Sequence, residues 1–389
     1  MSSSALDRSE IYDFAIIGAG IAGVSIAAHL APEASLCVIE AESQAGYHAT
    51  GRSAAMFVPA YGPPIIRMLT RASASFFHQP PEGFCEAPLL SARDILLIAR
   101  DDQQASLRQF QTEMEDAQIL NVIETDQLCQ HQPLLRDGYA LSGLIDPTGS
   151  DIDVHSLHRG FLRAMRHHGG ELITSAPVQA VSRQNGVWHI SVKGTVIKAH
   201  TIINAAGAWA EDIGQMAGAE MIGLVPKRRT ALLIEPQTGL DLDKMPMTID
   251  IDEAFYLKPE ARQILISPAN EDPMAPCDAQ PDEMDIAICI DRIERAFDLP
   301  IRRIQSKWAG LRSFVADKEP VIGYSDKVEG FFWLAGQGGY GIQSSPAAGR
   351  LGAALALGSA VPEDIAASGF AAQMLHPSRL LLSSDKVSV

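Results

Sequence analysis

Three consecutive cations, Lys227, Arg228 and Arg229, come directly before an apolar run in a chain whose formal charge is −16. An arginine side chain can hold a carboxylate through two parallel hydrogen bonds, and a carboxylate buried without such a partner is costly. Because Arg229 opens the apolar run, a strand fixes its direction, whereas Lys227 and Arg228 are expected to face solvent. On its own, Arg229 is better explained as a surface charge, so a carboxylate site needs support from other parts of the chain.

A second pattern that can do chemistry lies near the N-terminus, where three glycines follow the apolar run 12–17 with the spacing G-x-G-x-x-G. Gly18 permits a tight turn, Gly20 lets a pyrophosphate approach the backbone, and Gly23 lets the next helix lie close to the strand. The helix N-terminus adds free N–H groups and a positive dipole. A second apolar run ends at Glu40, 22 residues after Gly18, where a carboxylate can bind a ribose. The pattern predicts a dinucleotide site and leaves FAD and NAD open.

The elements that position these residues follow from periodicity and turn signals. Residues 46–62 are small and polar, as expected of a loop that wraps a ligand, and a helix is expected over 103–120. Another helix is expected after Asp153 as its N-cap, stopping at the next pair of glycines. Hairpin turns are expected at residues 185–186 and 193–194.

Strands dominate the later part of the chain. Residues 225–315 are mostly strands, with one helix near 282–297. Two further strands, one before Ala206 and one before Gly338, each end in small residues that allow a close backbone approach. Nucleotide-type segments thus occur at the start, the middle and the end of the chain, which predicts a discontinuous domain.

The composition narrows the functional class. With 389 residues, 47% of them hydrophobic, the chain can build a substantial core and two domains. An excess of 47 acidic over 31 basic residues argues against nucleic-acid binding. Five cysteines lie far apart, so neither a metal site nor a disulfide framework is expected, and a cytoplasmic location is the simplest setting. Residues 14–32 carry no Asp, Glu, Lys or Arg, but their glycine spacing favours the nucleotide turn over a transmembrane segment, and residues 1–10 are expected to be disordered.

The segments GAGIAG, GYHATGRSAA, INAAGAWA, WAGLRSF and GQGGYGIQ together resemble the D-amino-acid oxidase superfamily of FAD enzymes. Within it, EGFCEAPLLS, PKRR and FYLKP are similar to the bacterial D-arginine dehydrogenases. The resemblance implies an α/β fold with a discontinuous FAD-binding Rossmann-type doubly wound domain over residues 1–85, 144–217 and 318–389. It also implies a mixed-sheet α+β substrate domain over residues 86–143 and 218–317.

The resemblance implies non-covalently bound FAD. Sarcosine oxidases of the superfamily tether FAD to a cysteine near GLRSF, where this chain has none. The helix after GGYGIQ directs its positive N-terminus at the loop, which favours reduced flavin, and Pro346 fits a helix beginning. The cofactor-binding residues implied are Gly18, Gly20, Ile21, Ala22, Gly23, Glu40, Ala41, Thr50, Gly51, Arg52, Ser53, Ala54, Val178, Ala206, Gly207, Gly338, Gly339, Tyr340, Gly341, Ile342 and Gln343.

The resemblance also assigns catalytic roles. Arg229 and Arg312 would hold a substrate carboxylate, helped by the hydroxyls of Tyr61 and Tyr256. With the carboxylate fixed, hydride transfer from the α-carbon to flavin N5 gives an imino acid, which water hydrolyses to a 2-oxo acid and ammonia. The protein supplies orientation and electrostatics, and no side chain is assigned as a base. The predicted function is oxidative deamination of D-amino acids. The substrate pocket is expected to be lined by Met56, Val58, Ile95, Gly339 and Gln343.

Three of these positions depart from the D-arginine dehydrogenase pattern. Ile95 replaces the acid that receives the guanidinium, Met56 replaces a histidine, and Val58 replaces a threonine. A buried guanidinium facing isoleucine would lose an ion pair, which costs about 3–5 kcal/mol. A preference for apolar or less basic side chains is therefore expected. Asp94 points to the opposite face of a strand, although a one-residue shift in the pairing of the two sequences would restore an acidic pocket.

Two alternatives stay open. One is a secondary-amine or glycine oxidase of the sarcosine or D-proline type, since the same carboxylate clamp would serve it. The other is a flavin subunit that acts only with a partner. The electron acceptor, whether a quinone, another carrier or oxygen, is not readable from the sequence, nor is the oligomeric state. Attachment to the periphery of the inner membrane is likewise left open beside the cytoplasmic location.

Overall fold

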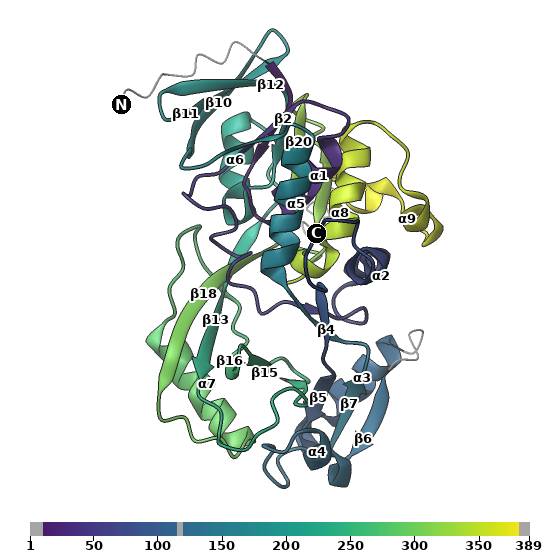
Figure 1. Cartoon of the computed structure of the whole chain (residues 1–389), viewed down its shortest axis with the longest axis vertical. Helices are drawn as coiled ribbons and strands as arrows, with labels where there is room; N and C mark the ends of the chain where they lie inside the picture. Colours follow the sequence, from purple (N-terminus) through teal and green to yellow (C-terminus); the bar gives the residue numbers. More distant parts are fainter. Residues whose placement is uncertain (1–10, 115–119, 381–389) are drawn as a thin grey trace, which may run out of the picture.

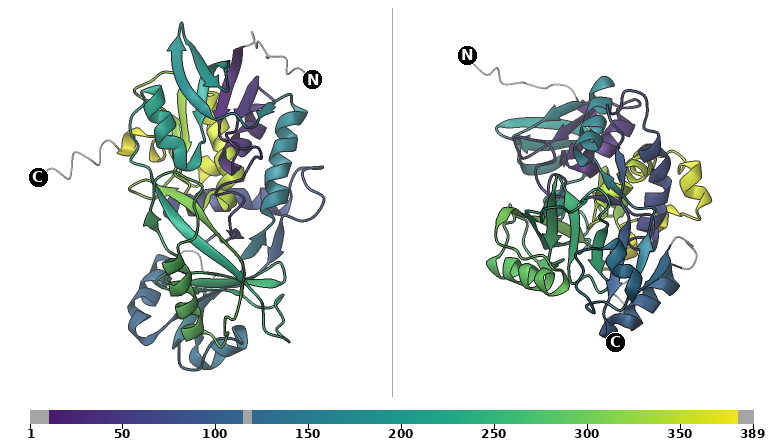
Figure 2. Two further views of the ribbon diagram at one scale, coloured as in Figure 1. Left: turned by 90° about the vertical axis from the view of Figure 1, so that its left-hand side faces the viewer. Right: turned by 60° about the horizontal axis from the view of Figure 1, so that its bottom comes forward.

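Two large β-sheets and a small one organise the chain, as the computed structural model shows for residues 11–114 and 120–380 (Figure 1). The eight-stranded sheet lies at one end of the long axis and the nine-stranded sheet at the other. The left view of Figure 2 shows the same two parts stacked along that axis. The expectation of a disordered tail falls on residues 1–10, outside the described residues.

The eight-stranded sheet has a parallel centre, because its strands are joined by crossover helices. Strands β9, β2, β1, β12 and β20 run parallel, and β12 pairs with β11 in its first half and with β20 in its second. The hairpin β10–β11 turns at residues 185–186, as predicted. The strands are β1 (Ile11–Ile17), β2 (Leu36–Ile39), β9 (Glu171–Ile173), β10 (Val178–Gln184), β11 (Val187–Val192), β12 (Thr195–Asn204), β19 (Val321–Tyr324) and β20 (Phe331–Ala335).

Alternation along β1 explains why both faces of this sheet are covered. Phe14 and Ile16 face one apolar core, whereas Ala15 and Ile17 face another. The first core holds helices α1, α2, α5 and α8, and the second holds α6. The helices of this part are α1 (Ile21–Leu30), α2 (Pro64–His78), α5 (Val154–His167), α6 (Ala210–Ala217), α8 (Gly341–Ala356) and α9 (Glu363–Ala367), with short 3-10 turns η3 (Gly207–Trp209) and η4 (Ala372–Met374).

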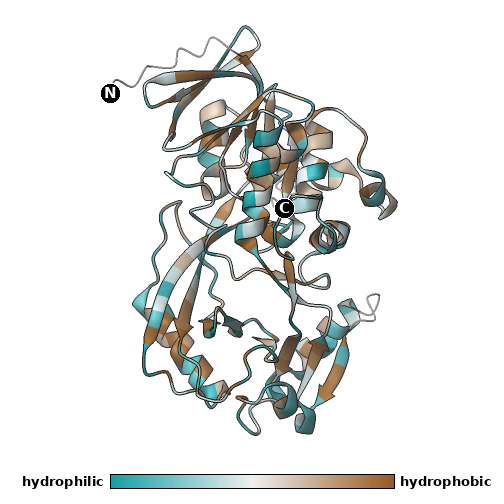
Figure 3. Ribbon diagram, viewed as in Figure 1, coloured by the Kyte–Doolittle hydropathy of each residue, from teal (hydrophilic) through white to brown (hydrophobic). Residues whose placement is uncertain are grey.

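Helix α5 shows how the sequence pattern places a helix against the sheet. Leu157, Phe161 and Met165 recur every four residues and are buried, while Arg159 and Arg163 are exposed. Figure 3 shows both hydrophobic and hydrophilic residues along this helix. Asp153 caps its N-terminus by accepting a hydrogen bond from the Ser156 backbone N–H at 2.8 Å, as predicted.

The nine-stranded sheet is mixed, with order β17-β13-β16-β15-β14-β5-β7-β6 and β18 paired to β13. Helix α7 covers it close to the predicted position. The strands are β5 (Ile95–Ala99), β6 (Asn121–Glu124), β7 (Ser142–Asp146), β13 (Val225–Ile234), β14 (Met247–Asp250), β15 (Tyr256–Glu260), β16 (Gln263–Ser267), β17 (Asp272–Pro273) and β18 (Ile304–Phe314). The helices are η1 (Asp101–Gln103), α3 (Gln104–Glu113), α4 (Thr125–His131) and α7 (Glu283–Ala296).

A three-stranded sheet links the two parts through β3 (Met56–Phe57), β4 (Leu90–Ala92) and β8 (Ser150–Ile152). The domain boundaries stay a prediction, and β7 crosses the predicted boundary at residue 144 because it pairs within the nine-stranded sheet. The helix expected over 103–120 ends at Glu113, and residues 115–119 lie outside the described residues. Within the described chain, no helix has the length and apolar character needed to cross a membrane.

Candidate active site

A cavity of about 440 Å³ opens where β1, β2 and β12 end. Gly18 has a φ of 104°, and a Cβ atom there would lie 2.4 Å from the Ala205 carbonyl oxygen. At Gly23, a Cβ atom would lie 1.9 Å from the carbonyl oxygen of Gly18. Both positions therefore require glycine for different reasons: Gly18 for its backbone conformation and Gly23 for the contact between α1 and β1. Gly18, Gly20 and Ile21 of this turn line the cavity.

Glu40 directly follows β2, lines this cavity and is buried. The backbone N–H groups of Ala19 and Glu42 donate to its carboxylate at 2.8 and 2.9 Å. These bonds fix the carboxylate beside the glycine turn. Glu40 thus lines the cavity, and its contact with a ribose hydroxyl stays a prediction.

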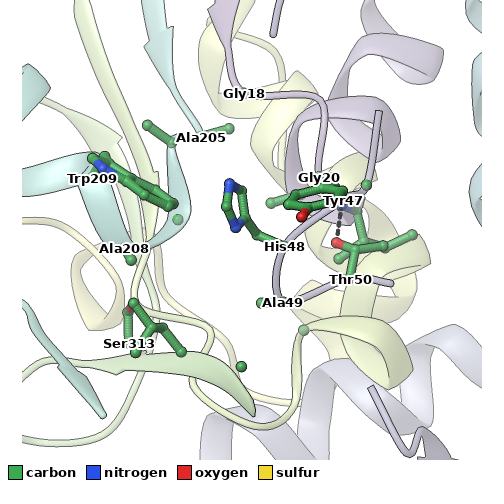
Figure 4. Close-up of a pocket in the computed structure, with 18 of the residues that line it drawn as sticks. Gly18, Gly20, Tyr47, His48, Ala49, Thr50, Ala205, Ala208, Trp209 and Ser313 are labelled. Atoms are coloured by element: carbon green, nitrogen blue, oxygen red, sulfur yellow. Dashed lines mark hydrogen bonds between the residues drawn. The ribbon is translucent and has the colours of Figure 1, made fainter. Parts of the chain in front are cut away.

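The loop after β2 is held to both halves of the molecule. The Thr50 hydroxyl oxygen accepts a hydrogen bond from the Ile21 N–H at 2.9 Å (Figure 4). Arg52 forms an ion pair with Asp278 and donates to the carbonyl oxygen of Ala309 at 2.8 Å. The arginine predicted to lie near the pyrophosphate thus lines the cavity and also ties the loop to the nine-stranded sheet.

Side chains that the sequence did not single out also line this cavity. Tyr47, His48 and Trp209 line it, and Figure 4 shows the His48 side chain between those of Tyr47 and Trp209. The His48 ring lies 4.7 Å from the Trp209 ring, and His48 Nε2 lies 3.0 Å from Glu42 Oε1. The composition of residues 46–62 indicated a ligand loop, but gave no sign of which side chains face the ligand.

Most of the predicted cofactor residues meet at this one cavity. Gly23 and Gly51 do not line it, because Gly23 packs against Gly18 and the Gly51 N–H bonds to the Gly46 carbonyl oxygen. Tyr340 and Gln343 line an adjoining cavity instead. The predicted cofactor residues that line the 440 Å³ cavity are Gly18, Gly20, Ile21, Ala22, Glu40, Ala41, Thr50, Arg52, Ser53, Ala54, Val178, Ala206, Gly207, Gly338, Gly339, Gly341 and Ile342.

Helix α8 begins at Gly341, so its N-terminus faces the cavity, as predicted. Pro346 does not mark the helix beginning, because it lies inside the helix. A proline there removes the N–H that would bond to the Ile342 carbonyl. The Ser345 hydroxyl donates to that oxygen at 2.9 Å and replaces the lost bond.

The adjoining cavity, of about 80 Å³, is the candidate substrate pocket. The two cavities share residues from both halves of the molecule, so they meet. The shared residues are Ser53, Ala54, Arg229, Tyr256, Arg312, Gly339 and Ile342.

The two arginines predicted to bind a carboxylate come from neighbouring strands, β13 and β18. Arg229 is 7% exposed, donates to the Asn270 carbonyl oxygen at 2.9 Å and pairs with Glu271 Oε1 at 3.0 Å. Burial, and next the charge of Arg312, lower the pKa of Arg229. Two like charges at a buried site are stabilised by an anion between them, which the carboxylate of a substrate can supply.

The expectation that Lys227 and Arg228 face solvent is wrong. Lys227 Nζ pairs with Glu271 Oε2 at 3.0 Å, and Arg228 pairs with Asp285 at 2.9 Å. Burial alone raises the pKa of Glu271, but the Lys227 hydrogen bond and the Arg229 charge outweigh it and leave that pKa lowered. Glu271 therefore stays ionised and holds Arg229 in place. Lys227 and Arg229 therefore share one carboxylate, that of Glu271. Glu271 lies on a distant segment, and nothing in the sequence indicated this contact.

Tyr61 and Tyr256 both line the substrate pocket. The Tyr61 hydroxyl donates to Glu253 Oε1 at 2.8 Å, and burial, then the Glu253 charge, raise the pKa of Tyr61. Burial also raises the pKa of the adjacent Tyr340 to about 12. The hydroxyls of Tyr61 and Tyr340 therefore stay protonated at neutral pH and can donate hydrogen bonds.

The predicted apolar wall is present. Met56, Val58 and Ile95 line the pocket together with further apolar residues of β5, β14 and α3. Gln343 supports this wall, because its side-chain oxygen accepts a hydrogen bond from the Val58 N–H at 3.0 Å. Two acids that line the pocket were missed: Asp146 of β7 and Glu253.

The family model for FAD-dependent oxidoreductases matches residues 13–355. The chain belongs to this family. FAD is accordingly its cofactor, and the observed cavity fits FAD, since the glycine turn, the buried Glu40 carboxylate and the N-termini of α1 and α8 all face it. No group of three or more His, Cys, Asp or Glu residues in the described chain could hold a metal ion.

Relatives with curated functions differ in their substrates. Mouse (Mus musculus) dimethylglycine dehydrogenase is 24% identical over 88% of this chain and 42% of its own length. The chain thus spans less than half of the dimethylglycine dehydrogenases it matches. Glycine oxidase of Bacillus licheniformis is 24% identical over 90% of this chain and 94% of its own. These relatives support the family and not D-arginine dehydrogenase in particular.

Solved structures agree on the fold. L-proline dehydrogenase from P. horikoshii has a TM-score of 0.80 at 20% identity, covering 96% of this chain and 99% of its own. Glycine oxidase from Geobacillus kaustophilus has a TM-score of 0.79 at 19% identity, covering 90% and 96%. The predicted fold class, an FAD-binding α/β domain with a second, mixed sheet, is therefore confirmed.

Proposed function

We propose that this protein oxidises the C–N bond of a small amine that carries a carboxylate. The observation that carries the proposal is the pair Arg229 and Arg312, which line both the cofactor cavity and the substrate pocket. Two guanidinium groups at the junction of these cavities would hold a carboxylate next to the flavin. A substrate fixed in this way presents its carbon–nitrogen bond toward the cofactor.

The side chains around the pocket would orient and shield the substrate. Arg229, held by Glu271, and Arg312 bind the carboxylate, and the Tyr256 hydroxyl donates a further hydrogen bond. Tyr61, bonded to Glu253, covers the same pocket and excludes water. FAD, when bound, supplies the acceptor for the hydride that leaves the substrate's α-carbon. No described side chain of the pocket needs to act as a strong base when the amine binds neutral.

The substrate is proposed to be of the glycine, N-methylglycine or proline type. The support is the set of relatives, which are dimethylglycine dehydrogenase, glycine oxidase and L-proline dehydrogenase. D-Amino acids with a side chain are the second candidate. One observation favours them: the pocket continues past the arginines between apolar residues such as Ile95, Leu97 and Phe110, where a side chain fits.

The test is anaerobic reduction of the bound flavin by single compounds, followed by loss of the oxidised-flavin absorbance. The panel contains glycine, sarcosine, N,N-dimethylglycine, both proline enantiomers, and D- and L-leucine and methionine. Bleaching by sarcosine or proline and not by D-leucine supports the first candidate, and the reverse supports the second. If none of them bleaches a flavin that dithionite reduces, the proposal is wrong, and a subunit that needs a partner becomes the better explanation.

A further inference from the structure

Asp146 is a buried carboxylate with one oxygen engaged and the other free. Its side chain is 1% exposed. Oδ1 accepts hydrogen bonds from the Thr148 N–H at 2.8 Å and from the Thr148 hydroxyl at 2.6 Å. Oδ2 is buried and has no hydrogen-bond partner among residues 11–114 and 120–380. Thr148 therefore fixes the direction of the carboxylate and leaves a free acceptor atom.

The position of Asp146 in the sheet places it in the substrate pocket. Asp146 on β7 lies opposite Ile95 on β5, and Ile95 lies opposite Met247 on β14. Residues directly opposite one another on paired strands share a face of the sheet. All three line the same pocket, so they form one row across its wall. The row therefore contains a carboxylate, Asp146, directly beside Ile95. Ile95 is the residue from which the sequence predicted an apolar pocket.

Within residues 11–114 and 120–380, no cationic side chain pairs with this carboxylate. The neighbouring pocket residues Leu97, Phe110 and Ile249 are apolar. The other acid of the pocket, Glu253, is already bonded to Tyr61. Arg93, two residues before Ile95, pairs with Asp151. A buried carboxylate with an unmatched oxygen is costly, and a cationic N–H donor in the pocket removes that cost.

We propose that Asp146 is a specificity-determining residue that binds a protonated amine at the far end of the substrate. The inference rests on the proposed function, because the arginine clamp sets the other end of the same molecule. A substrate with a carboxylate at Arg229 and Arg312 and an ammonium group at Asp146 matches both charged ends of the pocket. The chain between them lies against the apolar row of Ile95 and Met247. The chain that carries the distal ammonium group is attached either to the α-carbon or to the nitrogen of the amine that is oxidised.

The experiment compares matched pairs that differ only in the distal amine. D-Lysine is paired with D-norleucine, and N-(4-aminobutyl)glycine with N-butylglycine. Anaerobic flavin reduction is titrated with each compound to give an apparent dissociation constant. In the wild type, the ammonium-bearing member of at least one pair is expected to bind about 10- to 100-fold more tightly, the range of one hydrogen bond between charged groups. The pair that shows the preference identifies the attachment point.

Asp146→Asn tests the residue itself, because an amide oxygen can still accept both Thr148 bonds. The preference is expected to fall to within about threefold in this variant, while the apolar members of each pair change little. Asp243→Asn, on an exposed residue outside both cavities, serves as the control and should keep the wild-type preference.

The outcomes separate this inference from the proposed function. Equal or tighter binding of norleucine and N-butylglycine in the wild type overturns the role of Asp146 and leaves amine oxidation intact. An unchanged preference in Asp146→Asn also overturns it. If no member of either pair reduces the flavin while sarcosine or glycine does, the substrate lacks a distal group and the inference fails alone. If none of these compounds reduces it, the proposed function fails with it.

Discussion

The two cavities are built by different means although they meet. The cofactor cavity is shaped largely by backbone, with Gly18, Gly20 and the N-terminus of α8 at its edge. The substrate pocket is shaped by side chains that project from separate strands of the nine-stranded sheet, such as Arg229 and Tyr256. A substitution around the first should therefore reduce cofactor retention, and should also damage folding where a glycine makes a close backbone contact. One in the second should change substrate binding and leave the fold intact.

Gly23→Ala should have the largest effect and should break the cofactor side. The new methyl group would lie 1.9 Å from the Gly18 carbonyl oxygen, a backbone atom that cannot move without shifting β1 against α1. We expect a loss of at least about 3 kcal/mol in unfolding free energy, at the upper end of overpacking effects. Urea unfolding and the flavin content of the purified protein measure both consequences.

Gly20→Ala is the matched variant in the same motif. Its methyl group would meet only the Thr50 side-chain oxygen, at 3.3 Å, so the fold should survive while the approach of the cofactor is hindered. If Gly20→Ala keeps a stability close to that of the wild type but contains less flavin, the effects on folding and on cofactor binding are separable. Equal stability of Gly23→Ala and wild type would contradict the steric argument.

Arg312→Leu should have the next largest effect, and mainly on substrate binding, although Arg312 lines both cavities. Loss of one charged partner of the carboxylate removes about 3 kcal/mol, or roughly a hundredfold in substrate dissociation constant. Flavin content and the unfolding midpoint should stay near the wild type. Arg303→Leu, at an exposed position outside both cavities, is the control. If Arg312→Leu lost flavin as well as substrate affinity, the two cavities could not be altered independently at this residue.

Acid should weaken the cofactor half through His29 of α1. Burial, then the charge of Arg350, lower the pKa of His29 from 6.5 to about 4. Because the folded pKa lies below the unfolded value, protonation of His29 favours the unfolded state. The stability that neutral His29 retains is fully present above pH 6.5 and is lost progressively as the pH falls from 6.5 to 4. Between pH 7.5 and 5 the unfolding free energy should drop by about 2 kcal/mol from this residue. Urea titrations at both pH values measure the drop, and His29→Gln should reduce it; an unchanged drop would rule His29 out.

Tyr256→Phe should have the smallest effect. It removes one neutral hydrogen bond to the carboxylate, worth about 1 kcal/mol, so the substrate dissociation constant should rise roughly fivefold. Tyr139→Phe, in the same half of the molecule but outside both cavities, should leave binding unchanged. Identical substrate titrations for Tyr256→Phe and the wild type would remove Tyr256 from the proposed clamp.

The contrast also explains what could be predicted. The cofactor turn, the acid at Glu40 and the N-cap at Asp153 are encoded within short segments, because turns, caps and glycine contacts depend on local backbone geometry. The substrate pocket depends on strand pairing between distant segments. Asp146 lies beside Ile95 only because β7 pairs with β5, and Glu271 reaches Arg229 from another part of the chain. A sequence without pairing information cannot show such neighbours.

The packing of α1 against α8 has a consequence for biosynthesis. A Cβ atom at Gly349 would lie 2.8 Å from Ser25, so the two helices touch closely across the first apolar core. The first residue of α8 is made 320 residues after the first residue of α1. At about 5–20 residues per second, a ribosome needs roughly 16–64 s to bridge that interval. During this time the face of α1 that α8 will cover lacks its partner, so we expect the nascent chain to depend on chaperones until α8 is made.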